Sequence, residues 1–305
     1  MEFYKYLKAC REKKNITQEQ LVSALYEFDP KTFENLDTGT LSRWERNTTR
    51  PKFVKQVSIV RYFQQSFNDA LPCWEGYSEE EVEHLICTTG VQNIFGKPAQ
   101  LILNFPAESM EFDSLTVYPI RDIDTLDTLF ELNMDLHTAT NPPLLRVSLE
   151  QFKKWSVNPC SFFLACEYKE WFLGYFFSIK LKQEIFEKIM NFEMKKSEIT
   201  EDDFAAADEP GSNYLLSFYA LNNKVASILF IRYYAYLIAN QKYIAEIGVS
   251  TALEEVKKVV RNMNLDYYKT ITIEDRREVD SYRQNLGKIL SSEYVVKMIF
   301  SDPES

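Results

Sequence analysis

Apolar residues recur at helical spacing through the first 65 residues of the chain. Thr17 and Gln20 form an S/T-x-x-E/Q capping box, which predicts a helix that begins directly after Thr17. A second helix is predicted over residues 38–46, because Leu41 and Trp44 recur there at i, i+3 spacing. The pattern therefore predicts two short helices separated by a turn-forming stretch.

The pattern breaks between residues 71 and 110, which we interpret as a helical connector and linker. Pro72 and Gly76 interrupt the helical periodicity. Ser78 and Glu81 form a second capping box, which predicts a short helix. Residues 101–106 are apolar and are expected to pack on one domain, and residues 107–113 have the polarity of a linker, so we expect a domain boundary near residue 110.

From residue 114 onward, predicted strands alternate with predicted helices. The expected elements are a strand at 115–120, helices at 123–133 and from 148, a hairpin at 162–179, a strand at 214–221, a helix at 225–240, a strand at 243–249, a helix opened by a capping box at 251–254, and a strand at 294–300. This order predicts an α+β domain over residues 111–305 with a mixed central sheet.

Residues 3–63 resemble the Cro and phage-repressor (XRE-type) class of helix-turn-helix domains. The matching positions are Arg11, Gln18-Glu19-Gln20-Leu21, Ser42-Arg43-Trp44-Glu45-Arg46-Asn47 and Pro51. The resemblance implies an all-α DNA-binding domain over residues 1–70, in which Gln18 contacts a phosphate and Arg11 pairs with Glu45. The segment 26–36 is longer than the usual tight turn of this class.

The resemblance also implies which side chains contact DNA. The candidates lie on the outer face and ends of the second helix and just beyond it, together with Gln18: they are Thr38, Thr40, Ser42, Arg43, Arg46, Thr49 and Arg50. One such helix reads only a few base pairs. We therefore expect a double-stranded DNA operator with an inverted repeat, bound by a homodimer.

The charge of the chain is distributed unevenly. The net charge is −10, yet residues 1–65 contain twelve Lys and Arg against eight Asp and Glu, a local charge of +4. The remainder carries −14. A basic module on an acidic body agrees with docking on a polyanion through one face.

Composition excludes several classes of protein. At 305 residues and 45% hydrophobic, the chain has enough material for two domains. It has no run of about 18 apolar residues and no signal-peptide pattern, so we expect a cytoplasmic protein without a membrane partner. Five cysteines without C-x-x-C spacing and two histidines offer no zinc arrangement, so no metal site is expected.

The element order over residues 114–300, with Leu173-Gly174-Tyr175 in the hairpin, resembles the GNAT acetyltransferase superfamily. The superfamily holds acyl-CoA in a glycine-rich loop after its fourth strand, which corresponds here to residues 222–227. The resemblance implies that Asn222, Lys224 and Ser227 are the cofactor-binding candidates. Val225 replaces the first glycine, and its β-branched side chain is expected to crowd the phosphate path. We interpret the domain as a degenerate member without a resident cofactor, with acetyl-CoA or another acyl-CoA as the alternative.

No catalytic residue can be assigned from the sequence. The strand 214–221 contains no carboxylate to act as a general base, and Tyr282 in a Tyr-x-x-x-Gly-like context is one of 18 tyrosines. Phe218 and Tyr219 are expected to line a pocket for a small, acyl-like effector. The main hypothesis is a sequence-specific transcription regulator with a sensing or dimerising GNAT-like domain. The alternatives are an active N-acetyltransferase tethered to DNA and a purely structural dimerisation domain.

Overall fold

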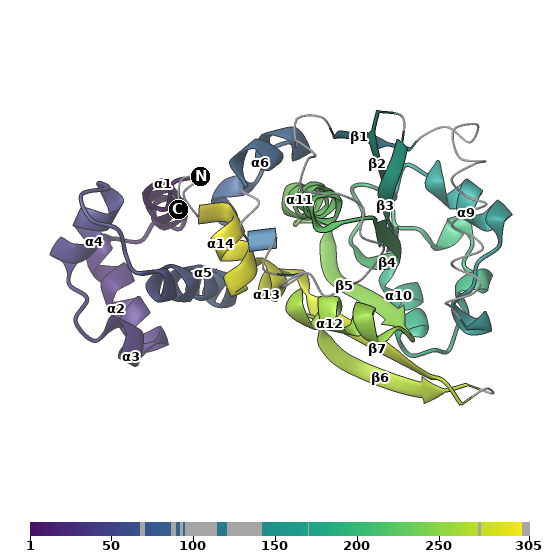
Figure 1. Ribbon diagram of the computed structural model, residues 1–305. Helices are drawn as coiled ribbons and strands as arrows, with labels where there is room; N and C mark the ends of the chain where they lie inside the picture. Colours follow the sequence, from purple (N-terminus) through teal and green to yellow (C-terminus); the bar gives the residue numbers. More distant parts are fainter. Residues whose placement is uncertain are drawn as a thin grey trace. The chain divides into compact units, whose positions relative to one another are not determined.

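The computed structural model describes residues 1–67, 71–86, 90–91, 94, 115–120, 142–169, 171–273 and 276–300. The chain divides into two compact units, a helical unit of residues 1–91 with 287–305 and a sheet unit of residues 92–286 (Figure 1). The predicted helix at 123–133 and the linker at 107–113 lie outside the described residues. Within the described part, no helix has the length and apolar composition needed to span a membrane.

The helical unit is built from short helices whose starts are encoded locally. They are α1 (Phe3–Lys13), α2 (Gln18–Phe28), α3 (Pro30–Phe33), α4 (Thr38–Glu45), α5 (Phe53–Phe67), the 3-10 turn η1 (Pro72–Trp74), α6 (Glu79–Leu85) and α14 (Glu293–Phe300). The capping boxes at Thr17 and Ser78 are confirmed, because each hydroxyl accepts the expected backbone hydrogen bond. The long segment 26–36 contains α3, which Asp29 caps by accepting from the Thr32 N–H.

The last described residues form a helix of the helical unit, so the strand predicted at 294–300 is wrong. Helix α14 buries apolar residues on most of its circumference, and Phe300 packs edge-on against Phe3 with ring centroids 5.1 Å apart. The amino group of Met1 donates to the Ile299 carbonyl at 3.2 Å. A short apolar run fits a buried helix as well as a strand, and packing against the N-terminal helices decides between them.

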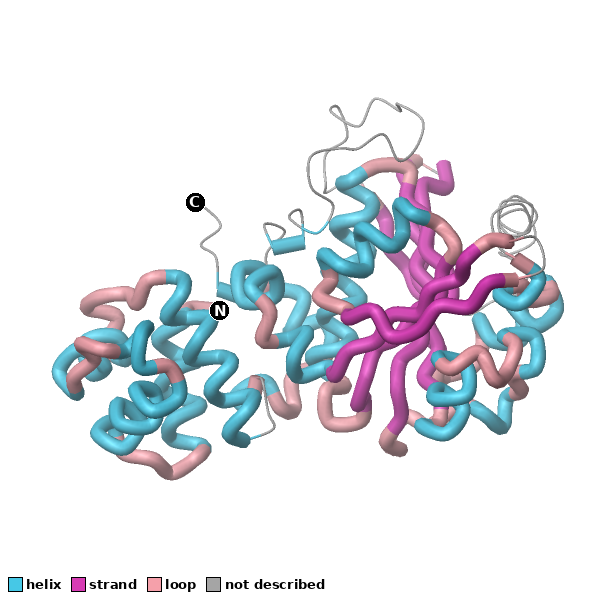
Figure 2. The backbone as a smooth tube through the Cα atoms, turned by 90° about the horizontal axis from the view of Figure 1, so that it is seen from below, coloured by secondary structure: helices cyan, strands magenta, loops and turns pink. Residues whose placement is uncertain are grey.

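The sheet unit contains one mixed sheet with the strand order β1-β2-β3-β4-β5-β7-β6. Its strands are β1 (Thr116–Pro119), β2 (Ser161–Tyr168), β3 (Trp171–Leu181), β4 (Gly211–Ala220), β5 (Ile244–Thr251), β6 (Asp266–Thr272) and β7 (Glu278–Asn285). Only β4 and β5 run parallel among the pairs of described strands. Figure 2 shows the twisted sheet with helices on both sides. The predicted α+β class with a mixed sheet is confirmed.

Helices cover the two faces of this sheet. They are α9 (Leu149–Ser156), α10 (Gln183–Met190), α11 (Asn223–Ala239) and α12 (Glu254–Asn262), with the short α13 (Leu286–Leu290) after β7. Phe177 of β3 packs on Phe152 of α9, with ring centroids 4.7 Å apart, whereas the preceding Phe176 packs on Phe230 of α11 at 5.2 Å. Because successive strand residues point to opposite faces, α9 and α11 lie on opposite sides of the sheet. We call these sides the α9 face and the α11 face.

The capping box predicted at residues 251–254 is wrong. Thr251 is the last residue of β5, and its hydroxyl accepts from the Leu253 N–H at 3.1 Å instead. Helix α12 begins at Glu254 without a side-chain cap. Pairing of β5 with β7, where Thr251 aligns with Asp280, keeps this residue in the sheet and overrides its local preference.

Candidate functional site

The two parallel strands of the sheet separate partway along their length. Strand β4 pairs with β5 from Gly211–Ile244 as far as Leu215–Val249, and β4 then continues to Ala220 beside β3 alone. A β-bulge in β4 lies at this point, because Phe177 and Ser178 of β3 align with Ser217 and Leu215. Residues 216–220, which we call the free segment, therefore have no strand partner on their β5 side among the described residues.

Helix α11 begins directly after the free segment, and its first turn contains the predicted cofactor-binding residues. The Asn222 side chain accepts from the Val225 N–H at 3.0 Å and so caps the helix. Lys224 is half-buried, whereas Ser227 is only 1% exposed and faces the interior. The structure thus places Asn222 and Lys224 at the helix start and removes Ser227 from the surface that a cofactor could reach.

Val225 does not point out from the helix start. It is fully buried, and a Cβ added to Gly174 of β3 would lie 2.9 Å from the Val225 Cγ1 atom. The side chain therefore packs onto the sheet at a position where β3 has no side chain. The expectation that Val225 crowds the phosphate path is wrong, because a residue at this turn of the helix faces the sheet.

Polar and aromatic side chains gather on the α9 face near the free segment. The hydroxyl groups of Tyr175 and Ser217 are 2.6 Å apart. Burial raises the pKa of Tyr175 to about 12, so the phenol stays protonated at neutral pH. Farther along the sheet, the Tyr118 hydroxyl donates to the Glu167 carboxylate. These pairs could not be predicted from local sequence patterns, because their members come from four different strands.

Phe218 and Tyr219, which were expected to line one pocket, pack against different partners. Phe218 packs on Phe230 of α11, with ring centroids 5.0 Å apart. Tyr219 packs beside Tyr175 on the α9 face, at 6.3 Å. The two side chains lie on opposite faces of the sheet, as the alternation of a strand requires, and they cannot line one cleft.

Tyr282 belongs to a buried network away from the free segment. It lies on β7, where its hydroxyl accepts from Arg261 and donates to Asp280, each at 3.2 Å. Asp280 in turn pairs with Lys257 at 2.8 Å. This set of partners holds α12 against β7, and the structure gives Tyr282 a packing role. Among the described residues, no group of three or more His, Cys, Asp or Glu side chains is placed to hold a metal ion.

A buried lysine is the most unusual polar group of the sheet unit. Lys196 is 3% exposed, and its ammonium lies 5.1 Å from the ring centroid of Tyr214. Burial lowers the pKa of Lys196 to about 7. In the described part of the chain this ammonium makes no ion pair. The sequence did not indicate it, because lysines are common and only the fold buries this one.

Several of the side chains predicted to contact DNA are bound within the helical unit. Gln18 donates to the Glu45 carboxylate at 2.6 Å, and Glu45 also accepts from Arg11 at 2.6 Å, which confirms the expected Arg11–Glu45 pair. Arg43 donates to the Thr40 hydroxyl at 2.7 Å, and Arg46 donates to the backbone carbonyl of Ser42 at 3.2 Å. Ser42 itself is half-buried. Thr38 and Thr49 are exposed.

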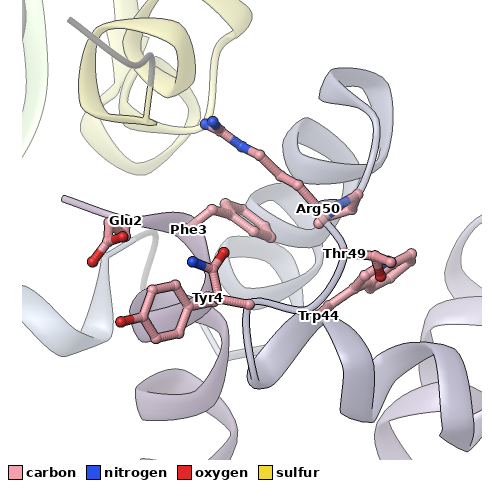
Figure 3. A pocket seen from close by; sticks show the side chains of 8 residues that line it. Glu2, Phe3, Tyr4, Trp44, Thr49 and Arg50 are labelled. Atoms are coloured by element: carbon pink, nitrogen blue, oxygen red, sulfur yellow. The ribbon is translucent and has the colours of Figure 1, made fainter.

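Arg50, the remaining candidate, extends toward the C-terminal segment and donates to the Phe300 carbonyl (Figure 3). It lines a cavity of about 230 Å³ within the helical unit. The lining residues are Glu2, Phe3, Tyr4, Trp44, Asn47, Thr49, Arg50 and Pro51. Only Thr49 and Arg50 of the predicted DNA contacts belong to this cavity.

Comparison with known proteins returned solved structures only. No family model matches the chain, and no curated protein does. Naa50 of Arabidopsis thaliana, solved with a bisubstrate analogue, is 13% identical over 56% of this chain and 98% of its own, with a TM-score of 0.37. FeeM, an N-acyl amino acid synthase from uncultured soil microbes, is 8% identical over 58% and 93%, with a TM-score of 0.41. The aminoglycoside acetyltransferase AAC(6')-Ib with coenzyme A is 14% identical over 58% and 97%, with a TM-score of 0.35.

These findings correct the main functional hypothesis. The structural neighbours are acetyltransferases and an acyl amino acid synthase, and nothing found supports DNA binding or transcription regulation. The interpretation as a repressor-like regulator is therefore wrong, and the acetyltransferase alternative agrees better with the findings. The mixed sheet with its parallel β4–β5 pair agrees with the element order predicted for residues 114–300.

Proposed function

We propose that the sheet unit is an acyl-CoA-dependent N-acyltransferase. The observation that carries this proposal is the separation of β4 from β5 after Leu215–Val249. A strand edge inside a sheet normally has a partner, because unpaired backbone N–H and C=O groups are costly when buried. The free segment offers those groups to a ligand, and an extended chain with amide groups of its own, such as a pantetheine arm, is suited to pair with them.

The start of α11 suits the phosphate end of the same ligand. A helix N-terminus attracts anions through its N–H groups and its dipole, and Lys224 adds a positive charge there. Because Val225 faces Gly174, its β-branched side chain does not obstruct the outer surface of the first turn, where a phosphate would bind. The Asn222 side-chain oxygen accepts the hydrogen bond of the Val225 N–H, so a bound phosphate oxygen would replace the Asn222 oxygen as the acceptor.

The reaction requires few groups from the protein. The bound thioester supplies an activated acyl carbon, an acceptor amine forms the new C–N bond, the C–S bond breaks, and one proton passes from the amine to the leaving sulfur. Ser217 in the free segment and Tyr175 beside it on β3 carry hydroxyl groups that can relay this proton. The protonated state of the Tyr175 phenol at neutral pH suits a donor to a thiolate.

Calorimetric titration of the full chain with acetyl-CoA tests the proposal. Binding in the micromolar range is expected, together with amine-dependent release of free thiol. Lys224→Glu should weaken acetyl-CoA binding about tenfold or more, because it reverses the charge at the helix start. Lys258→Glu is the matched control, since Lys258 is exposed on α12 and should leave the affinity unchanged.

Two results would overturn the proposal. One is the absence of acetyl-CoA and longer acyl-CoA binding at millimolar concentration by a folded chain. The other is binding that responds equally to Lys224→Glu and Lys258→Glu, because this would place the cofactor away from the start of α11.

A further inference from the structure

The α9 face carries one carboxylate that no basic side chain neutralises in the described part of the chain. Glu167 is half-buried on β2, and its described side-chain hydrogen bond comes from the Tyr118 hydroxyl on β1. A neutral phenol orients a carboxylate without cancelling its charge. Partly buried carboxylates in proteins are usually compensated by a cation, so Glu167 is a place where a cationic ligand group would be stabilised.

Three aromatic rings lie between this carboxylate and the free segment. Phe172 aligns with Glu167 across the β2–β3 pair, and Tyr175 aligns with Tyr219 of the free segment. The rings of Phe172, Tyr175 and Tyr219 are nearly parallel, with interplanar angles of 11 to 26° and centroids 6.3 to 6.5 Å apart in every pair. Phe172 and Tyr219 are only half-buried, so part of this ring layer faces solvent.

We infer that Glu167 and the ring layer formed by Phe172, Tyr175 and Tyr219 bind the second cationic group of a di- or oligoamine acceptor. The inference rests on the proposed function, which places the reacting amine at the free segment. Glu167 lies two strands from β4, about 10 Å at about 4.8 Å per strand. An aliphatic amine chain that spans this distance covers the rings, where its methylene groups and charges are favoured by apolar and cation–π contact.

The distance of about 10 Å between Glu167 and the free segment also distinguishes this acceptor from a simple monoamine. An alkylamine has one cationic nitrogen, and placing it at the free segment leaves Glu167 without a cationic partner. A chain such as spermidine carries a further ammonium about 10 Å from its reacting end, at the spacing that the strands set. Selectivity for the longer acceptor then comes from one charge-assisted contact rather than from the shape of an enclosed pocket.

The test measures binding of spermidine and of hexylamine to the full chain at fixed ionic strength. Spermidine should bind at least tenfold more tightly than hexylamine. Glu167→Gln should remove most of that preference, and Phe172→Leu should weaken spermidine binding about threefold by removing one ring. Glu278→Gln is the matched control, because Glu278 is an exposed carboxylate at the start of β7. Thermal melting of each variant establishes that it is folded.

The failure of this inference can be separated from failure of the proposed function by titrating the same variants with acetyl-CoA. Unchanged acetyl-CoA affinity in Glu167→Gln, with weakened spermidine binding, supports the acceptor site. Equal spermidine binding by wild type and Glu167→Gln would overturn it, even if acetyl-CoA binds normally. If the chain binds spermidine through Glu167 but does not bind acetyl-CoA, the proposed acyltransferase function is refuted. Glu167 and the ring layer would then be a binding site for cations only.

Discussion

The side-chain oxygen of Asn222 accepts a hydrogen bond from the backbone N–H of Val225 at 3.0 Å. This bond closes the start of α11 at the point where the proposed cofactor would place its phosphates. Intramolecular capping and phosphate binding therefore compete for the same donor. A helix start can serve both purposes in turn, because a side-chain cap is worth only about 1 kcal/mol.

Asn222→Ala should lower the free energy of unfolding of the unliganded chain by about 1 kcal/mol, because the Val225 N–H loses its partner. The variant should also gain more stability than wild type from saturating acetyl-CoA, since the phosphate no longer displaces a cap. Thermal melting with and without acetyl-CoA measures both effects. Asn222→Asp keeps the cap but repels phosphate, so its stability should be retained and its acetyl-CoA affinity reduced. Equal ligand-induced shifts in all three proteins would contradict the competition.

Gly174→Ala should disturb the contact between β3 and the start of α11. The added Cβ would lie 2.5 Å from the Tyr219 carbonyl oxygen and 2.9 Å from the Val225 Cγ1 atom, so the strand or the helix must shift. Overpacking of this kind costs about 1 to 3 kcal/mol, and acetyl-CoA binding should weaken with it. Urea denaturation and calorimetry provide the measurements. Gly39→Ala is the control, because its Cβ meets only ordinary contacts inside α4 and should be neutral or slightly stabilising.

Lys196 should make the stability of the chain depend on pH. Its pKa of about 7 in the folded state lies below the ordinary lysine value, so the unfolded state binds more protons between about pH 7 and pH 10. The free energy of unfolding should therefore rise with pH across this window, by at most about 1.4 kcal/mol per pH unit from this residue. Lys196→Met should flatten the rise and stabilise the chain at pH 7. Urea denaturation at pH 6.5, 8 and 9.5 tests this, and identical slopes in both proteins would exclude Lys196 as the source.

Glu45→Ala should destabilise the helical unit strongly. The Glu45 carboxylate accepts from both Arg11 and Gln18 and is nearly buried. Its removal takes away both hydrogen bonds between the Arg11 guanidinium and a carboxylate, and leaves this poorly solvated cation with the Ile16 carbonyl and the Glu12 carboxylate at 3.7 Å. Breaking a buried pair in this way costs about 3 to 5 kcal/mol. Chemical denaturation followed by Trp44 fluorescence reports on this unit. Glu27→Ala removes an exposed carboxylate on α2, away from Arg11, and should change stability by less than about 0.5 kcal/mol. A Glu45→Ala protein as stable as Glu27→Ala would show that the pair is not buried in solution.

Features that depend on residues close together along the chain could be predicted from the amino-acid sequence. Helix starts at Thr17, Ser78 and Ser148 followed from capping boxes, because the hydroxyl and the partner side chain are three residues apart. The β2–β3 hairpin followed from two apolar runs around a short polar turn. The Arg11–Glu45 pair came from the resemblance to a helix-turn-helix domain, and the same resemblance led to a functional hypothesis that was wrong.

Features that join distant segments of the chain arise only when the chain folds. Residues 294–300 became α14 because the apolar surface of α1 was available to bury them, and a run of seven such residues fits either a helix or a strand. Val225 turned toward Gly174 because the sheet lies beneath the first turn of α11. The bulge in β4 and its separation from β5 created the free segment. A register shift in the β2–β3 pairing after Cys166 aligns Glu167 with Phe172, which brings the carboxylate to the ring layer. Contacts of this kind depend on which strands become neighbours, and no local pattern of residues encodes that choice.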